Sequence, residues 1–202
     1  MMKRIICVLF ALFLSLNVFS ITLDGFKAKI KDGFDNFTHS SLINMIGDGT
    51  TDVTPQLKQR IIKLAQKDPG KLRNQLREQN NAGRTPLFYA VEMMDEQLLD
   101  MMLDGLSIYA KDVINTPDYD GISVLAETLR INDLRRSIIA KKLIDKGADC
   151  NYTFNSGNLI NASILILAIK TQDKELIRLI LSKTNNVNEY VTLGDYKNME
   201  VT

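Results

Sequence analysis

The sequence is short of several residue types that mark particular protein classes. It contains no tryptophan, one histidine, two cysteines and four prolines among 202 residues. Neither sign of charge dominates, because there are 25 Lys and Arg residues and 24 Asp and Glu residues. A chain so close to neutrality has no strong field to draw it onto nucleic acid or an anionic membrane. With 45% hydrophobic residues and only 11 glycines, it belongs with globular rather than disordered or fibrous chains.

Common active-site signatures are also missing. None of the patterns H-E-x-x-H, C-x-x-C, G-x-S-x-G and G-x-x-x-x-G-K-S/T occurs. The single histidine, His39, lies among polar residues, and nothing in the sequence brings it to Cys150 as a nucleophilic pair. Residues 116–127 place acids and a glycine at some EF-hand positions, but Thr116 and the proline after it favour a turn over a calcium loop. We therefore expect no enzyme activity, no cofactor and no metal site.

Residues 1–20 differ from the rest of the chain. Lys3 and Arg4 precede an apolar run from Ile5 to Leu16, and Ser20 stands at the expected cleavage position. This pattern predicts a signal peptide and hence a periplasmic or secreted protein. The run is shorter than the about 20 apolar residues that a spanning helix needs, and an uncleaved anchor is the alternative. Cleavage would leave Cys150 as the one thiol, which we expect to be free and buried.

The next part of the sequence has little regular pattern and is followed by two helical segments. Residues 21–52 are predicted to be a linker with possible short helices, because glycines interrupt its apolar residues. Thr54 at the cap and Pro55 in the first turn open a predicted helix that ends before Pro69, and a second helix is predicted from Pro69 to Gln79. We interpret residues 53–79 as a helical cap or a degenerate repeat. The apolar positions expected to be buried in it are Leu57, Ile61, Ile62, Leu64, Ala65, Leu72 and Leu76.

Three later segments resemble one another. Their corresponding residues Leu87, Leu125 and Leu165 are 38 and 40 positions apart. Each segment begins with a turn and continues as two amphipathic helices, so none can bury its apolar faces without its neighbours. We expect the inward side chains of the first segment to be Leu87, Ala90, Leu98, Leu99, Met102 and Leu103.

Two motifs in these segments resemble a known family. The first is the run Gly83-x-Thr85-Pro86-Leu87-x-x-Ala90, and the second is Leu143-Ile144-x-x-Gly147-Ala148-Asp149-x-Asn151. Both are similar to the opening and closing signatures of the ankyrin repeat. The resemblance implies an all-α ankyrin repeat solenoid of about three helix-turn-helix repeats over residues 80–190, with residues 191–202 as a tail. The spacings exceed the usual about 33 residues, which indicates extra residues around 106–111, 130–135 and 153–157.

Ankyrin repeats recognise proteins, so the resemblance implies a partner-binding concave face made of turn tips and inner helices. Carrying the family's contact positions over to this sequence implies that Tyr119, Arg84 and Arg130 lie there, and aromatic and arginine side chains contribute most to such interfaces. The full set carried over from the family is Asn81, Ala82, Arg84, Glu92, Met93, Tyr119, Asp120, Ile122, Arg130, Ile131, Leu159, Ile160, Ala162, Lys170 and Thr171.

The chain resembles exported ankyrin proteins of host-associated bacteria, which predicts a monomer that mediates protein–protein interaction. Its partners would include no nucleic acid and, once the signal is cleaved, no membrane. One alternative is a cell-envelope accessory protein or inhibitor that binds and protects one secreted enzyme. Another is a small hydrolase within residues 21–52.

Overall fold

The computed structural model describes residues 41–47, 49–156, 159–185 and 192–193 of the chain. The predicted signal peptide, His39 and most of the expected linker and tail lie outside these residues. The elements in chain order are α2 (Leu42–Ile46), α3 (Thr54–Lys67), α4 (Pro69–Arg77), α5 (Pro86–Glu92), α6 (Glu96–Leu106), the short 3-10 helix η1 (Ser107–Tyr109), α7 (Ala110–Ile114), α8 (Val124–Arg130), α9 (Arg136–Asp145), β1 (Thr153–Ser156), β2 (Leu159–Ser163), α10 (Ile164–Thr171), α11 (Lys174–Lys183) and β3 (Thr192–Leu193).

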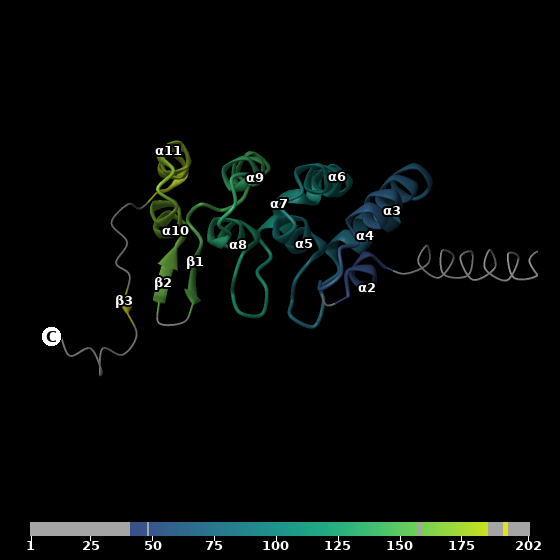
Figure 1. Cartoon of the computed structure of the whole chain (residues 1–202), viewed down its shortest axis with the longest axis horizontal. Coiled ribbons are helices and arrows are strands. Elements are labelled where there is room, and N and C mark those ends of the chain that lie inside the picture. Colours follow the sequence, from purple (N-terminus) through teal and green to yellow (C-terminus); the bar gives the residue numbers. More distant parts are fainter. Residues whose placement is uncertain (1–40, 48, 157–158, 186–191, 194–202) are drawn as a thin grey trace, which may run out of the picture. The chain divides into compact units, whose positions relative to one another are not determined.

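The helices form two rows, as the repeat pattern predicts (Figure 1). The hairpins α5–α6, α8–α9 and α10–α11 are the three expected repeats. Helices α5, α8 and α10 pack side by side as the inner row, while α3, α6, α9 and α11 form the outer row. The turns before the inner helices project away from the outer row. The predicted all-α solenoid of helix-turn-helix repeats is confirmed, with a small antiparallel sheet added to it.

Apolar side chains at the expected positions hold the rows together. Leu87 and Leu125 are 0% and 1% exposed, and Leu165 is 8% exposed. Truncating such a residue to alanine typically costs 2–5 kcal/mol because a cavity remains. The expected inward residues of the first repeat are all buried, namely Leu87, Ala90, Leu98, Leu99, Met102 and Leu103.

Hydroxyl caps form at two of the three inner helices. Ser123 Oγ accepts from the backbone N–H of Ala126 at 3.2 Å. Ser163 Oγ accepts from Ile166 in the same way at 3.3 Å. Thr85 holds the equivalent position before α5, but its side chain makes no cap hydrogen bond and its Oγ1 is buried without a partner. The fixed φ of Pro86 is enough to begin that helix.

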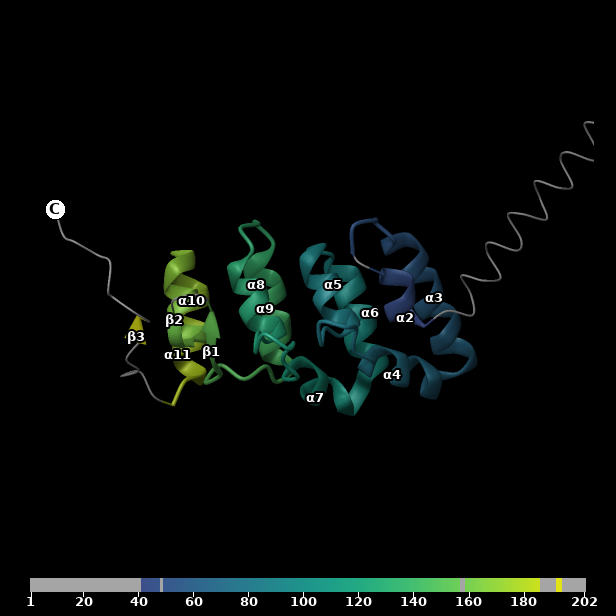
Figure 2. The same ribbon diagram turned by 90° about the horizontal axis from the view of Figure 1, so that it is seen from below.

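The first helical hairpin differs from the sequence interpretation. Helix α2, within the expected linker, lies against α5 and so takes the inner-row position, while α3 lies against α6. Helix α4 is therefore an additional element that packs on α6. Figure 2 shows α4 and the second added helix, α7, along one edge of the stack. Residues 106–111, expected as a longer connection, belong largely to η1 and α7.

Two further expectations about the first hairpin are wrong. Ile62 is 49% exposed and Ala65 is also exposed, because the buried side of α3 consists of Leu57, Ile61 and Leu64 together with the side chain of Arg60. Thr54 is the first residue of α3 rather than its cap. Its backbone N–H donates to Asp52 Oδ1 at 2.9 Å instead.

Cys150 is buried, as expected, with 3% of its surface exposed. Burial raises the pKa of its thiol to about 11, and the neighbouring Asp149 carboxylate acts in the same direction. The reactive thiolate is therefore scarce at neutral pH. In a Cys7→Ser variant, we expect an aromatic disulfide reagent to modify the native thiol at least about a hundredfold more slowly than the thiol in denaturant. Equal rates in buffer and denaturant would contradict this placement.

Candidate functional site

The turns before α5 and α8 have the same design. Asn80 Oδ1 accepts hydrogen bonds from the backbone N–H groups two and four residues further on, both at 2.9 Å. Asp118 Oδ1 accepts from the equivalent groups at 3.1 and 2.9 Å. Gly83 and Gly121 supply the positive φ that each turn needs, at 77° and 76°. These side-chain acceptors hold the backbone of both tips in one conformation.

The two turns are joined at Tyr119. Its backbone N–H donates to the carbonyl of Ala82 at 2.9 Å, and its ring lies against Gly83. The side chain nevertheless remains 73% exposed. Among the predicted residues, Tyr119 thus combines a large exposed ring with a fixed backbone, while Asn81 and Asp120 are exposed beside it.

Arg84 is held by partners within the chain. Its Nε donates to Asp118 Oδ2 at 3.1 Å, a terminal nitrogen pairs with Glu92, and the guanidinium lies 5.3 Å from the centroid of the Phe88 ring. Desolvation raises the pKa of Glu92, Arg84 opposes that shift, and Glu127 adds to it. Arg84, Glu92 and Asp120 line one hollow of about 260 Å³ between α2 and α5. The structure therefore brings these predicted residues together, but it already pairs two of them.

Two predicted contact residues point inward, contrary to expectation. Ile122 is 3% exposed, because the turn directs its side chain into the core while its N–H donates to Asp118. Ala162 is 0% exposed, because the third turn is the hairpin β1–β2, in which Phe154 pairs with Ala162. The side chains of Leu159 and Ile160 lie outside the described ones. Met93, Ile131 and Thr171 are half-buried.

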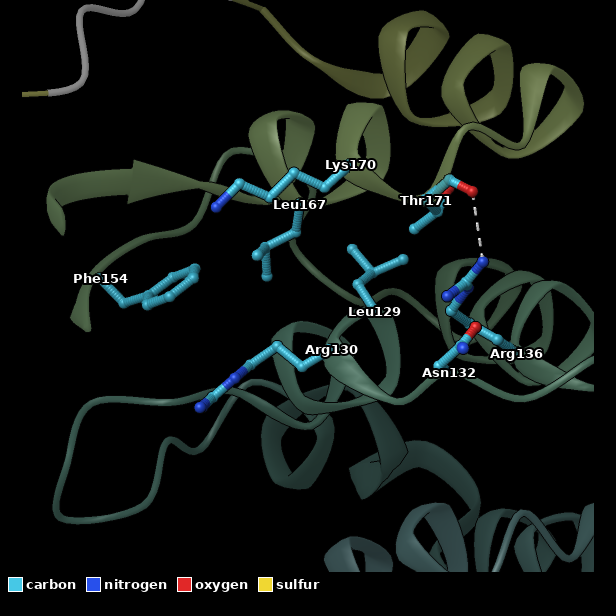
Figure 3. Close-up of a pocket in the computed structure, with 8 residues that line it drawn as sticks. All are labelled: Leu129, Arg130, Asn132, Arg136, Phe154, Leu167, Lys170 and Thr171. Carbon is cyan, nitrogen blue, oxygen red and sulfur yellow. Dashed lines mark hydrogen bonds between the residues drawn. The ribbon is translucent and has the colours of Figure 1, made fainter. Parts of the chain in front are cut away.

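Arg130 and Lys170 face a groove of about 580 Å³ between α8 and α10 (Figure 3). They occupy equivalent positions in successive repeats, 40 residues apart. Arg130 pairs weakly with Glu127 at 3.5 Å on its own helix and keeps 44% of its side chain exposed. Lys170 is exposed and forms no ion pair with another residue of the described part of the chain. The groove is lined by Leu129, Arg130, Asn132, Arg136, Phe154, Leu167, Lys170 and Thr171.

The sequence interpretation missed half of this groove. Phe154 and Leu167 form part of its wall, and Arg136 closes one end. None of these three residues belongs to the set carried over from the ankyrin family. In the structure Arg135 pairs with Asp133 at 2.9 Å, and this arginine holds the pKa of Asp133 at about 2. The equivalence of positions 130 and 170 was the one signal that could have indicated the groove.

The described residues contain no cluster of three or more His, Cys, Asp or Glu side chains that could hold a metal ion. At the segment that resembles an EF-hand, both carboxylate oxygens of Asp118 already accept hydrogen bonds from the protein. Within the same residues, no helix is long and apolar enough to cross a bilayer.

Comparison with known proteins yields a likeness of fold. No family model matches the chain, and no curated protein is similar to it in sequence. Among solved structures, the crystal structure of EF0377, an ankyrin repeat protein, is similar over 78% of this chain and 92% of that one, at 19% identity and a TM-score of 0.36. That TM-score is too low to carry an argument, so the assignment to ankyrin-like repeats depends on the motifs and hairpins of the chain itself.

Proposed function

We propose that the chain is an exported, non-catalytic protein that binds another protein through its inner face. The inner face comprises the turns before α5, α8 and α10 and the exposed sides of those three helices. Tyr119 carries the proposal, because a ring that is 73% exposed on a fixed turn offers contact area at little entropic cost. The adjacent groove supplies concave surface with polar rims, which is typical of a binding site.

Site-specific photo-crosslinking tests the position of the binding face. A benzophenone amino acid replaces Tyr119 in one variant and Lys63, an exposed residue of outer-row helix α3, in the control. We expect position 119 to form a crosslink to one discrete protein in the cells that make the chain. Position 63 should give none. The same crosslink from both positions, or from neither, would reject the inner face as the binding site.

Export is tested separately. The pattern of residues 1–20 supports it, and the mature chain is expected to begin at Ile21 in the periplasmic or secreted fraction. Cell fractionation followed by mass spectrometry of the N-terminal peptide measures both features. A chain that retains residues 1–20 in the cytoplasm would rule out export while leaving the binding face untouched.

A further inference from the structure

The groove between α8 and α10 has cations but no carboxylate among its lining residues. Arg130 and Lys170 come from the two inner helices, and Arg136 lies at the other end (Figure 3). The acid nearest to Arg130 is Glu127, whose oxygen is 3.5 Å away, a long pair on the surface of one helix. Such a pair stabilises little, so it leaves Arg130 available for a stronger partner.

The charge of Arg136 is fixed but is not matched by an ion pair in the described residues. Its two terminal nitrogens donate to the carbonyls of Ile131 at 3.2 Å and Thr171 at 3.4 Å, while its Nε is buried without a partner. Asp173 is near, and Ser137 and the first amides of α11 lower its pKa, with a smaller contribution from Arg136. Asp173 therefore stays ionised and offsets part of the charge of Arg136, so the cations most available to a ligand are Arg130 and Lys170.

The wall between the cations is apolar and rigid. Leu167 and Phe154 lie between the side chains of Arg130 and Lys170 in Figure 3. The Phe154 ring stacks on Tyr152 at a centroid distance of 6.5 Å, and the Tyr152 hydroxyl donates to the carbonyl of Gly121 at 2.9 Å. Phe154 and Leu167 expose only 5% and 7% of their surfaces, so a ligand would meet a small preformed apolar patch, which reduces the entropy lost on binding.

The inner helices change charge along the stack at one repeated position. Glu92, Arg130 and Lys170 each follow their repeat leucine by five residues. Glu92 is paired with Arg84, whereas Arg130 has only its long pair with Glu127, and Lys170 has no ion pair in the described part of the chain. Of the charges at these three equivalent positions, the two without a close partner are therefore positive, and they lie on α8 and α10.

From this geometry we propose that the α8–α10 groove binds an acidic segment of the partner protein, with an apolar side chain next to its carboxylates. This inference rests on the proposed function and names the chemistry of the partner. The carboxylates meet Arg130, which can bind one with two parallel hydrogen bonds, and Lys170. The apolar side chain packs against Phe154 and Leu167. The near neutrality of the whole chain favours such a peptide over nucleic acid.

Selection from a display library of random short peptides by the full chain tests the proposal. We expect the selected peptides to be rich in Asp and Glu beside Leu or Phe, and to bind more weakly as salt is raised. The variant Arg130→Glu with Lys170→Glu should bind a selected peptide at least about tenfold more weakly, measured by fluorescence anisotropy. In a fresh selection it should prefer basic peptides.

A matched control separates the groove from total charge. Lys63→Glu with Lys174→Glu makes the same change in net charge at exposed positions of outer-row helices, and it should bind like the unaltered chain. The double glutamate variant could lose binding by misfolding. A second variant, Arg130→Gln with Lys170→Gln, therefore removes the charges without reversing them and should also weaken binding. Circular dichroism checks that both variants are folded. Loss in the control as well, or retention in both groove variants, would overturn the proposal.

The remaining outcomes are equally decisive. Selected peptides without acidic residues, no enrichment at all, or displacement of the peptide by an oligonucleotide at equal concentration would each reject an acidic protein segment. If both groove variants still formed the crosslink from position 119 in full yield, the binding face would stand and the groove would not be part of it.

Discussion

Replacing Gly83 by alanine is expected to lower the free energy of unfolding by about 3 kcal/mol, because two costs add at this position. The residue has φ of 77°, which strains any residue with a Cβ. An added Cβ would also lie 2.6 Å from Tyr119 Cδ1 and 2.8 Å from the Tyr119 backbone nitrogen. That nitrogen cannot move freely, because it donates to the carbonyl of Ala82 at 2.9 Å.

Gly121→Ala is the matched control for this substitution. Gly121 has nearly the same φ, 76°, but an added Cβ there meets nothing within 4 Å. It should therefore cost only the conformational strain, about 1 to 2 kcal/mol. Urea denaturation followed by circular dichroism compares the two variants. Equal losses would show that the contact between the first two turns contributes nothing to stability.

The repeat architecture could be predicted because the same physical requirement recurs along the chain. Leu87, Leu125 and Leu165 are each the second residue of an inner helix, at a place where a buried apolar side chain packs between neighbouring hairpins. A requirement repeated at regular spacing is visible in a single sequence. The turn residues Gly83 and Gly121 added independent support, since each has the positive φ that such a turn needs.

The start of the stack could not be predicted in the same way. Helix α2 has five residues, too few to show a period, and its two buried side chains are Leu42 and Met45. Its place beside α5 depends on tertiary contacts. The connection that follows α2 is also tied to α5, by the hydrogen bond from the backbone N–H of Val53 to the Tyr89 hydroxyl, 36 residues away in sequence, at 2.9 Å. Because α3 and α4 have a clear helical pattern in the sequence and α2 has none, the sequence interpretation joined α3 and α4 in one hairpin and omitted α2.

The exposure of the candidate contact residues was predicted better on the inner helices than in the turns. Arg130 is the last residue of α8 and Lys170 the last but one of α10, and the contact positions of the ankyrin family were carried over to both. Ile122 and Ala162 lie in segments without a helical period, and hydrogen bonding of the turn and pairing of the strands decide which way they point. Phe154 reaches the groove only because β1 folds back along β2.

Replacing Asp118 by alanine is expected to cost about 3 kcal/mol, the second large effect. The side chain is 1% exposed and serves three donors at once. Its Oδ1 accepts from the backbone N–H groups of Asp120 and Ile122, and its Oδ2 accepts from Arg84. Alanine leaves all three donors without this acceptor. Arg84 keeps 29% of its side chain exposed, so water compensates the cation in part and the two amides carry most of the cost.

Asp118→Asn separates the amides from the ion pair. Asn80 shows in the preceding turn that an amide oxygen can accept from both backbone groups, at 2.9 Å each. The asparagine variant should therefore keep the turn and cost about 1 kcal/mol, because it loses both the charge and the acceptor opposite Arg84, where a donor amide replaces Oδ2. Urea denaturation measures both losses, and crosslinking from position 119 should persist in the asparagine variant but fall in the alanine variant, whose turn is no longer held. Equal destabilisation by the two substitutions would mean that the ion pair, rather than the side-chain acceptor, fixes the tip that presents Tyr119.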